Sequence, residues 1–296
     1  MFVWIALILV LVAVLCIAYG VFIERSWYRL VRYRLNILPA GQHEPLDILH
    51  LSDLHFVRND KKKIDFLSNL PKADIAVITG DLLGEPEAVE TAVAALRPVR
   101  GLTASYFVLG SNDYFVPRPL NYFRYFFGPR RGRKATVGRA WELVDHLEAG
   151  GWVHLANARA EISMNGFGVE IAGIDDPHIH RPDLRSAGRR SPDRLGLAIV
   201  HSPDPAPELV ALGYDLVVAG HTHGGQVRLP WIGALVNNCM LPRSMSKGLI
   251  RMGNGLLHVS PGLGTSKYAP FRFLCPPEAT LLEIRPSTRP DRSSAG

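Results

Sequence analysis

The chain has 296 residues, of which 47% are hydrophobic and 20% are charged, so it can fill the core of one large domain and is not intrinsically disordered. Lys and Arg number 33 against 27 Asp and Glu, a formal net charge of +6. This excess suits an anionic partner such as phosphate, nucleic acid or a lipid headgroup, without choosing among them. The cysteines at 16, 239 and 275 show no CxxC or zinc spacing, which excludes a disulfide scaffold.

Residues 2–23 are uncharged and almost all apolar. A helix of this length can cross a hydrocarbon core about 30 Å thick. A cleaved signal peptide is the alternative, but no basic region precedes the stretch and no small-x-small cleavage site follows it. We therefore predict a single-pass anchor in the cell membrane. Residues 24–44, with arginines at 25, 29, 32 and 34, are expected to form a basic juxtamembrane linker that keeps the following domain in the cytoplasm.

The next part of the chain alternates apolar runs with helical patterns. Short buried runs predict strands at 47–52, 74–79, 105–109, 197–200 and 215–219, and further strands of hairpin character at 162–174 and 256–259. Helices are expected at 85–96 and 140–147. This alternation predicts an α/β domain with substantial parallel pairing over residues 45–285. Residues 286–296 are rich in Ser, Arg and Pro and are expected to be disordered.

The segment 117–139 is unusual because it combines five aromatic residues with seven Lys or Arg residues. One interpretation is a surface insertion whose aromatic rings cap the core. The other is a membrane-contacting lobe, with aromatic rings at the acyl boundary and arginines on lipid phosphates. The sequence leaves both open.

Polar side chains follow five of the predicted strands directly. They are Asp53 and His55, then Asp81, then Asn112 and Asp113 in Gly110-Ser-Asn-Asp, then His201, and finally His221 and His223 in Gly220-His-Thr-His-Gly. In α/β sheets ligands gather at the carboxyl ends of the strands, so we expect these groups to converge.

Carboxylates, imidazoles and one amide are ligands that suit Mn²⁺, Fe²⁺ or Zn²⁺. In Asp-x-His and His-x-His, alternate residues of an extended segment share a side and can reach one centre. A lone Asp-x-His is usually surface decoration, but all five motifs in this order predict a shared metal site. The histidines at 50, 146, 154 and 258 are expected to be structural.

Together these motifs resemble the calcineurin-like metallophosphoesterase superfamily. With the apolar N-terminus and the segment Gly173-Ile-Asp-Asp-Pro-His178, the chain is similar to its bacterial membrane-associated branch, which includes enzymes similar to UDP-2,3-diacylglucosamine pyrophosphatases. The resemblance covers residues 45–285. It implies a four-layer α/β/β/α sandwich with a dinuclear metal site at one edge of its two sheets.

The resemblance also implies the ligands of two divalent ions. One ion would take Asp53, His55, Asp81 and His223, and the other would take Asp81, Asn112, His201 and His221, with Asp81 bridging. A hydroxide shared by two such ions attacks phosphorus in line. The catalytic set implied is Asp81, Asn112, Asp113 and His221.

The third motif departs from the family pattern Gly-Asn-His-Asp. Strict register puts Ser111 in the ligand position, whereas a slip of one residue puts Asn112 on the metal and Asp113 near the leaving group. We prefer the slip, because an amide oxygen is a better ligand than a neutral hydroxyl. The acid histidine is missing either way, so we expect phosphoanhydrides and aryl esters to be preferred over alkyl esters.

Asp176 and His178 either line the substrate mouth or belong to a turn stabilised by Pro177. The function expected is hydrolysis of a phosphoric ester or anhydride, in a lipid-linked or nucleotide-linked substrate at the membrane. The alternatives are a nucleotide or nucleic-acid phosphodiesterase, a protein phosphatase, and a catalytically silent metal-binding membrane protein. No specific nucleic acid is expected as a partner.

Overall fold

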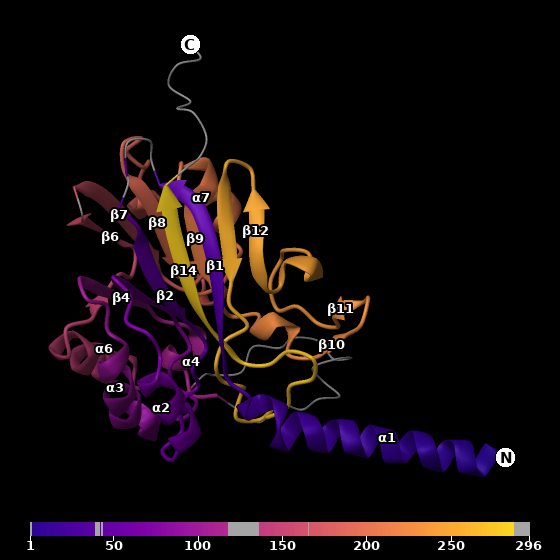
Figure 1. The fold of residues 1–296 in the computed structure, drawn as a ribbon. Helices are drawn as coiled ribbons and strands as arrows, with labels where there is room; N and C mark the ends of the chain where they lie inside the picture. Colours follow the sequence, from indigo (N-terminus) through magenta and orange to yellow (C-terminus); the bar gives the residue numbers. More distant parts are fainter. Residues whose placement is uncertain (1, 39–41, 43, 118–135, 165, 287–296) are drawn as a thin grey trace.

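The computed structural model of the chain describes residues 2–38, 42, 44–117, 136–164 and 166–286, and the structural statements below concern these residues. Two six-stranded mixed sheets face each other, and helices cover both outer faces (Figure 1). The first sheet has the strand order β1 (Arg29–Leu38), β14 (Glu278–Pro286), β2 (Leu46–Leu51), β3 (Ile75–Thr79), β4 (Ala104–Val108), β5 (Val153–His154). The second has the order β12 (Gly248–Met252), β13 (Gly255–Val259), β9 (Leu216–Ala219), β8 (Leu195–Val200), β7 (Phe167–Ile174), β6 (Ala158–Met164).

The helices and a small hairpin complete the architecture. The helices are α1 (Phe2–Phe22), α2 (Lys61–Ser68), α3 (Val89–Leu96), α4 (Ser111–Tyr114), α6 (Ala140–Ala149) and α7 (Ala206–Ala211). A two-stranded hairpin consists of β10 (Arg228–Leu229) and β11 (Gly233–Ala234). Single 3₁₀ turns include η1 (Glu24–Ser26), η4 (Pro177–Ile179), η5 (Leu184–Ala187) and η6 (His223–Gly225).

The alternation of side chains along the strands produces three cores. Leu49 and Leu51 of β2 belong to the core beneath α2, α3 and α6, whereas Ile48 belongs to the core between the two sheets. A third core lies between the second sheet and α7, where Val217 packs with Leu209. Strand side chains point to opposite faces in turn, so strands with apolar residues on both faces must lie inside such a stack. The four-layer α/β/β/α sandwich is therefore confirmed.

The predicted strands lie where expected to within two residues, except that the strands of hairpin character predicted at 162–174 begin four residues earlier and form the antiparallel hairpin β6–β7. The linker prediction for 24–44 needs correction, because β1 occupies 29–38 and pairs in parallel with β14 from Arg29↔Glu278 onward. The arginines of β1 lie on exposed positions while Leu35 and Leu38 are buried, so a charged run concealed an amphipathic strand. The sequence analysis also missed α2 and β14.

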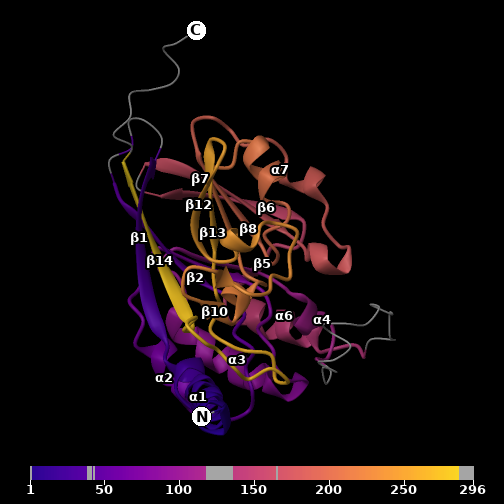
Figure 2. The same ribbon diagram turned by 90° about the vertical axis from the view of Figure 1, so that its right-hand side faces the viewer.

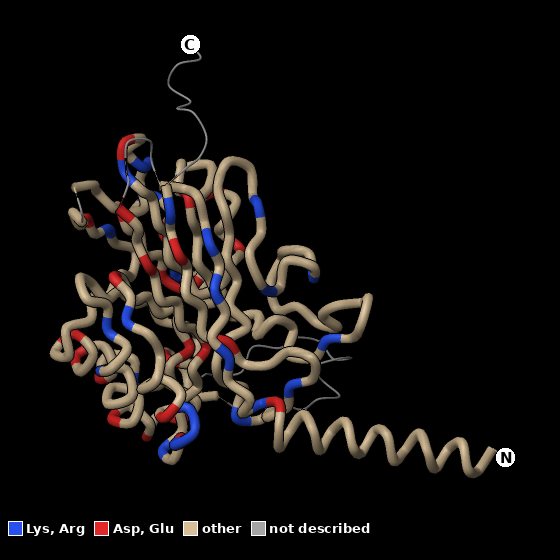
Figure 3. The backbone as a smooth tube through the Cα atoms, in the orientation of Figure 1, with Lys and Arg blue, Asp and Glu red and all other residues tan. Residues whose placement is uncertain are grey.

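The helix α1 extends away from the sandwich with its apolar side chains exposed, and it is long and apolar enough to be a possible membrane span (Figure 1). Its last turns pack on the loop 271–275. The Glu24 carboxylate is buried and accepts hydrogen bonds from the backbone N–H groups of Leu274 and Cys275, at 2.9 and 2.5 Å. A Cβ added at Gly20 would lie 2.3 Å from the Phe271 ring, so only glycine permits this approach. Lys and Arg residues gather where α1 joins the domain and along β1 (Figure 3).

Two predicted segments lie outside the described residues. Positions 118–135, most of the aromatic and basic segment, are among them, although a bridge between Phe115 and Val137 joins its described ends. The tail 287–296 is the other.

Candidate metal centre

The predicted ligands come together at one edge of the sandwich. They follow the carboxyl ends of β2, β3 and β4 in the first sheet and of β8 and β9 in the second. These strands are parallel within each sheet, so their carboxyl ends meet at one edge, where ligands of α/β proteins bind.

The backbone at this edge is strained. Five of the predicted ligands have a positive φ, between 43° and 68°: Asp53, His55, Asp81, His221 and His223. The left-handed conformation costs a non-glycine residue about 1–2 kcal/mol, and such residues cluster at functional sites. The five residues that can bind metal are therefore also residues whose backbone conformation is unfavourable, as expected of a functional site.

Glycines let the loops approach the carboxylates. A Cβ at Gly220 would lie 2.3 Å from Asp53 Oδ2, and one at Gly110 would lie 2.3 Å from Asp81 Oδ1. Any larger residue at either position would displace a carboxylate, which accounts for the glycines in Gly-His-Thr-His and Gly-Ser-Asn-Asp.

The first half-site consists of Asp53, His55, Asp81 and His223, whose ligand atoms all lie within 4.8 Å of one another. The Nε2 atoms of His55 and His223 are 3.2 Å apart. His55 Nε2 lies 3.6 Å from Asp81 Oδ2, and His223 Nε2 lies 3.6 Å from Asp53 Oδ1. Ligands about 2.0–2.2 Å from a tetrahedral ion are roughly 3.3–3.6 Å from each other, so these residues fit a divalent cation.

The second half-site consists of Asp81, Asn112, His201 and His221. His201 Nε2 lies 3.5 Å from Asp81 Oδ1 and 3.2 Å from His221 Nδ1. The other ring nitrogens face backbone carbonyls: His201 Nδ1 is 2.7 Å from Thr79 O, and His221 Nε2 is 3.2 Å from Asn238 O. A carbonyl can only accept, so each of these nitrogens carries the proton and donates. That leaves His201 Nε2 and His221 Nδ1 as free ligand atoms.

Asp81 connects the two half-sites. Its Oδ2 faces His55 while its Oδ1 faces His201, so one carboxylate offers an oxygen to each side. Burial alone would raise the pKa of Asp81, but the neighbouring imidazoles of His201 and His55 and the N–H of Asn112 hold it below its usual value. Asp81 therefore has the position and the charge that an anionic bridge between two cations would need.

The remaining charges also favour a cation here. Burial raises the pKa of Asp53 to about 6. Burial acts to lower the pKa of His201, but Asp81, Asp176 and Asp53 outweigh it and raise that pKa to about 9. Without metal, the buried carboxylates thus stabilise a protonated His201. A divalent ion would supply this positive charge in place of the proton.

Asn112 and Asp113 have different surroundings. The Asn112 amide NH₂ donates to Asp81 Oδ2 at 2.5 Å, and its backbone N–H donates to Oδ1 at 2.9 Å. A half-turn of this amide would put its oxygen in place of the NH₂ group, at the edge of the metal centre beside Asp81. Asp113 is fully buried, and its oxygens accept from the N–H groups of Leu83 and Gly110. These contacts make it a capping residue of α4 and do not support the predicted position near a leaving group.

His178 and Asp176 lie beside the second half-site. The His178 ring is 4.4 Å from the ring of His221, between centroids, and is partly exposed. Asp176 is buried, and its Oδ1 accepts from the backbone N–H of His178, which caps η4. The turn interpretation is confirmed for Asp176, and the same turn places His178 beside His221, while contact with substrate stays a prediction.

The sequence analysis missed a buried hydrogen-bonded chain behind Asp53. Ser52 Oγ donates to Asp53 Oδ2 at 2.6 Å, Thr79 Oγ1 donates to Ser52 Oγ at 2.7 Å, and His50 Nε2 lies 2.9 Å from Thr79 Oγ1. His258 closes the chain, with its Nδ1 2.9 Å from His50 Nδ1. The signal was present in the sequence, because polar residues at 50 and 52 share one face of an otherwise apolar strand. His50 and His258 are thus buried, as predicted, and are connected to a ligand.

Arg272 was also missed. It is fully buried, and its guanidinium donates to the carbonyls of Pro261, Gly262, Gly264 and Cys275. A Cβ at Gly262 would lie 2.6 Å from the Cβ of Asp53, so Arg272 holds the loop that supports this ligand.

A cavity of about 280 Å³ adjoins the first half-site. Its lining includes His55, Lys63 and Lys267, together with Arg25 and Ser26 from the turn directly after α1. It therefore links the metal ligands to the junction with α1.

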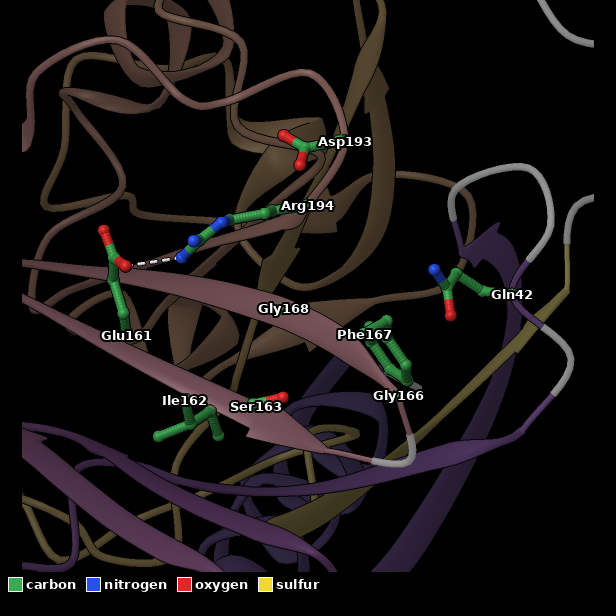
Figure 4. Close-up of a pocket in the computed structure, with 9 residues that line it drawn as sticks. All are labelled: Gln42, Glu161, Ile162, Ser163, Gly166, Phe167, Gly168, Asp193 and Arg194. Carbon is green, nitrogen blue, oxygen red and sulfur yellow. Dashed lines mark hydrogen bonds and ion pairs between the residues drawn. The ribbon is translucent and has the colours of Figure 1, made fainter.

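A larger cavity of about 520 Å³ lies elsewhere, beside the turn between β6 and β7 at the amino end of β7 (Figure 4). Its lining includes Gln42 and the ion pair of Glu161 with Arg194. It does not border the converged ligands, so its size does not make it the active site.

Comparison with known proteins agrees with this geometry. Residues 46–225 match the family model for calcineurin-like phosphoesterases. An uncharacterized metallophosphoesterase, YkuE of Bacillus subtilis, is 29% identical over 84% of this chain and 82% of its own length. The phosphodiesterase YaeI of Escherichia coli is 25% identical, and the UDP-2,3-diacylglucosamine pyrophosphatase LpxG of Chlamydia trachomatis is 26% identical, each over 88% of this chain and 90% of its own length. The chain therefore belongs to the calcineurin-like phosphoesterase family and is a hydrolase of the phosphoesterase class.

Proposed function

We propose that this hydrolase uses two divalent ions, Mn²⁺, Fe²⁺ or Zn²⁺, to cleave a phosphoric ester or anhydride in a lipid-linked or nucleotide-linked substrate at the membrane. The observation that carries the proposal is the Asp81 carboxylate, which presents one oxygen to each half-site. A single ion would not need ligands on both sides of this carboxylate.

Divalent ions bound here would neutralise phosphoryl charge and lower the pKa of water near the phosphorus. The chain's own residues set the geometry for this chemistry. The carbonyls of Thr79 and Asn238 fix the ring orientation of His201 and His221, and Ser52 holds one oxygen of Asp53. The partly exposed His178 stands where substrate would enter, next to His221, and can donate a proton or a hydrogen bond to a phosphoryl oxygen.

The position of the cavity beside His55 supports a membrane-linked substrate. Its wall carries Arg25 from the turn after α1, together with Lys63 and Lys267, although the last two pair with Asp60 and Glu85. A phosphorylated headgroup in this cavity would reach the first half-site from the side of α1. We further propose that α1 is a single-pass anchor and that the arginines following it keep the domain in the cytoplasm.

The test uses the full chain in nanodiscs, loaded with Mn²⁺, and assays bis-p-nitrophenyl phosphate beside a UDP-linked lipid. We expect two ions per chain by mass spectrometry of the metal, and metal-dependent turnover. Asp81→Ala should lower turnover by about 10³-fold or more, because several kcal/mol of charge stabilisation are lost. Asp145→Ala is the matched control, since this exposed carboxylate lies on α6.

The faster of the two substrates decides between a lipid anhydride and a generic diester. Stoichiometric metal binding without turnover on any substrate would favour a catalytically silent metal-binding protein. Equal activity in Asp81→Ala would contradict the dinuclear proposal.

A further inference from the structure

The hairpin β10–β11 exposes an unusual group of apolar side chains. Trp231 is fully exposed at its turn, with φ at 63°, and Ile232 beside it is 66% exposed. Leu229, Leu235 and Met240 add to the surface at 36%, 39% and 85%. We call these five residues the apolar tip. Single exposed apolar residues are normal, but five within twelve positions, including an aromatic ring on a projecting turn, indicate a contact surface.

The apolar tip lies on the face from which α1 leaves. In Figure 1 the hairpin and α1 project from the same side, and Figure 2 looks onto that side with α1 almost end-on and β10 in front of the sheets. A bilayer that contained α1 would therefore face the hairpin. This continuity identifies a lipid surface as the occupant.

The charge of the segment agrees with a lipid surface. Residues 226–247 contain Arg228, Arg243 and Lys247 and no Asp or Glu. Arg243 is exposed, and its guanidinium donates to the carbonyl of Leu235 at 3.1 Å, which places a cation next to the apolar tip. Aromatic and aliphatic side chains flanked by arginine are typical of segments that enter the interfacial region of an anionic bilayer.

The same hairpin is attached to the metal centre at both ends. It begins five residues after His223 and ends four residues before Asn238, whose carbonyl accepts from His221 Nε2. A Cβ at Gly225 would lie 2.4 Å from the Cβ of Ala234 in β11, so the hairpin packs directly on the motif that supplies both histidines.

We propose that the apolar tip inserts into the interfacial layer of the bilayer that α1 crosses, as a second membrane contact that turns the metal centre toward the headgroups. The proposal rests on the proposed function only for the role of α1 as an anchor. The contact of the apolar tip with lipid is separate from both, because α1 could anchor the protein and the ligands could bind metal without it.

Quenching of tryptophan fluorescence by brominated phosphatidylcholine measures this contact directly. The full chain is reconstituted in vesicles of phosphatidylcholine and phosphatidylglycerol, as wild type, Trp231→Phe and Trp141→Phe. Trp141 is the matched control, because it is 59% exposed but lies on α6 of the outer helical layer. We expect Trp231→Phe to reduce the lipid-quenched emission and Trp141→Phe to leave it unchanged. Equal quenched emission in the two variants would overturn the proposal.

A kinetic comparison tests the consequence for the site. Replacing Trp231 and Ile232 together by serine should lower kcat/KM for a vesicle-embedded phospholipid ester by about tenfold or more and leave hydrolysis of soluble bis-p-nitrophenyl phosphate unchanged. Trp141→Ser with Leu102→Ser is the control pair, since both residues are exposed away from the hairpin. An equal effect of both pairs on the vesicle substrate would contradict the role of the apolar tip. A chain inactive on every ester would defeat the proposed function, and the quenching result would still decide the membrane contact.

Discussion

The two half-sites share Asp81 but differ in what surrounds them. The first half-site has two carboxylates and two imidazoles, all buried, and a hydrogen-bonded chain behind Asp53. The second has two imidazoles, the shared carboxylate and the amide of Asn112, with the partly exposed His178 beside it. With one carboxylate more than the second, the first half-site is expected to bind its ion more tightly.

The largest expected effect comes from removing one histidine of each half-site. His223→Ala and His221→Ala should each lower turnover by about 10³-fold, because each removes a ligand from a centre that stabilises several kcal/mol of developing charge. Manganese titration of the metal-free protein should show two steps. We expect His223→Ala to lose the tighter step and His221→Ala the weaker one. Loss of the weaker step in His223→Ala and of the tighter step in His221→Ala would contradict this difference between the two half-sites.

The next effect concerns the leaving group. In the described residues no histidine occupies the third motif, so wild-type rates should fall by about 10² or more from p-nitrophenyl to alkyl phosphodiesters. Kinetics over a series of esters measure how steeply the rate falls as the leaving group becomes more basic. Asn112→His should make this dependence weaker if position 112 faces the leaving group. Comparable rates on aryl and alkyl esters in the wild type would show that another acid, with His178 the first to test, already serves.

A smaller effect is expected behind the first half-site. Ser52→Ala and Thr79→Val interrupt the series of hydrogen bonds behind Asp53. Loss of such supporting contacts typically costs 10–100-fold in metal affinity. Only the tighter titration step should weaken. Ser105→Ala is the control, because this buried serine hydrogen-bonds to Gly101 N at the amino end of β4. Equal weakening of both titration steps would show that these hydrogen bonds do not support metal binding at the first half-site in particular.

The last effect is on stability rather than activity, and it concerns the histidines at the far end of the hydrogen-bonded chain behind Asp53. Burial lowers the pKa of His258 to about 3 and that of His50 well below its usual value, so both are neutral in the folded protein. Unfolded histidines bind a proton near pH 6.5. The free energy of unfolding of the metal-free protein should therefore be unaffected by these groups above that pH. It should fall as the pH drops toward 3, by up to about 1.4 kcal/mol per pH unit for each histidine.

Denaturant unfolding of wild type and His258→Asn between pH 6.5 and about 3 checks this sign and size. In His258→Asn, the free energy of unfolding should fall less steeply as the pH drops, by up to about 1.4 kcal/mol per pH unit. An identical slope would mean that His258 takes up its proton without unfolding.

The accuracy of the sequence analysis followed from how local each signal was. The candidate metal ligands could be recognised in the sequence because each sits in a short motif directly after an apolar strand, as Asp53 and Asp81 do. The sandwich followed from the same strands. The role of Asp113 could not be read from the sequence, because a helix cap and a general acid share one residue type; the N–H groups of Leu83 and Gly110 show the capping contacts. The strand β1 was missed because its partner β14 lies about 250 residues later, and Arg272 was missed because its partners are backbone carbonyls, which leave no pattern in the sequence.

The pairing of β1 with β14 also has a consequence for how the chain folds. Arg29 pairs with Glu278, about 250 residues later, so β1 has no partner strand until β14 has been synthesised. At translation rates of about 5–20 residues per second, β1 waits roughly 12–50 s with unpaired backbone groups. If α1 enters the bilayer first, β1 spends this interval at the lipid surface, and its alternating arginines would protect the unpaired edge from aggregation until β14 arrives.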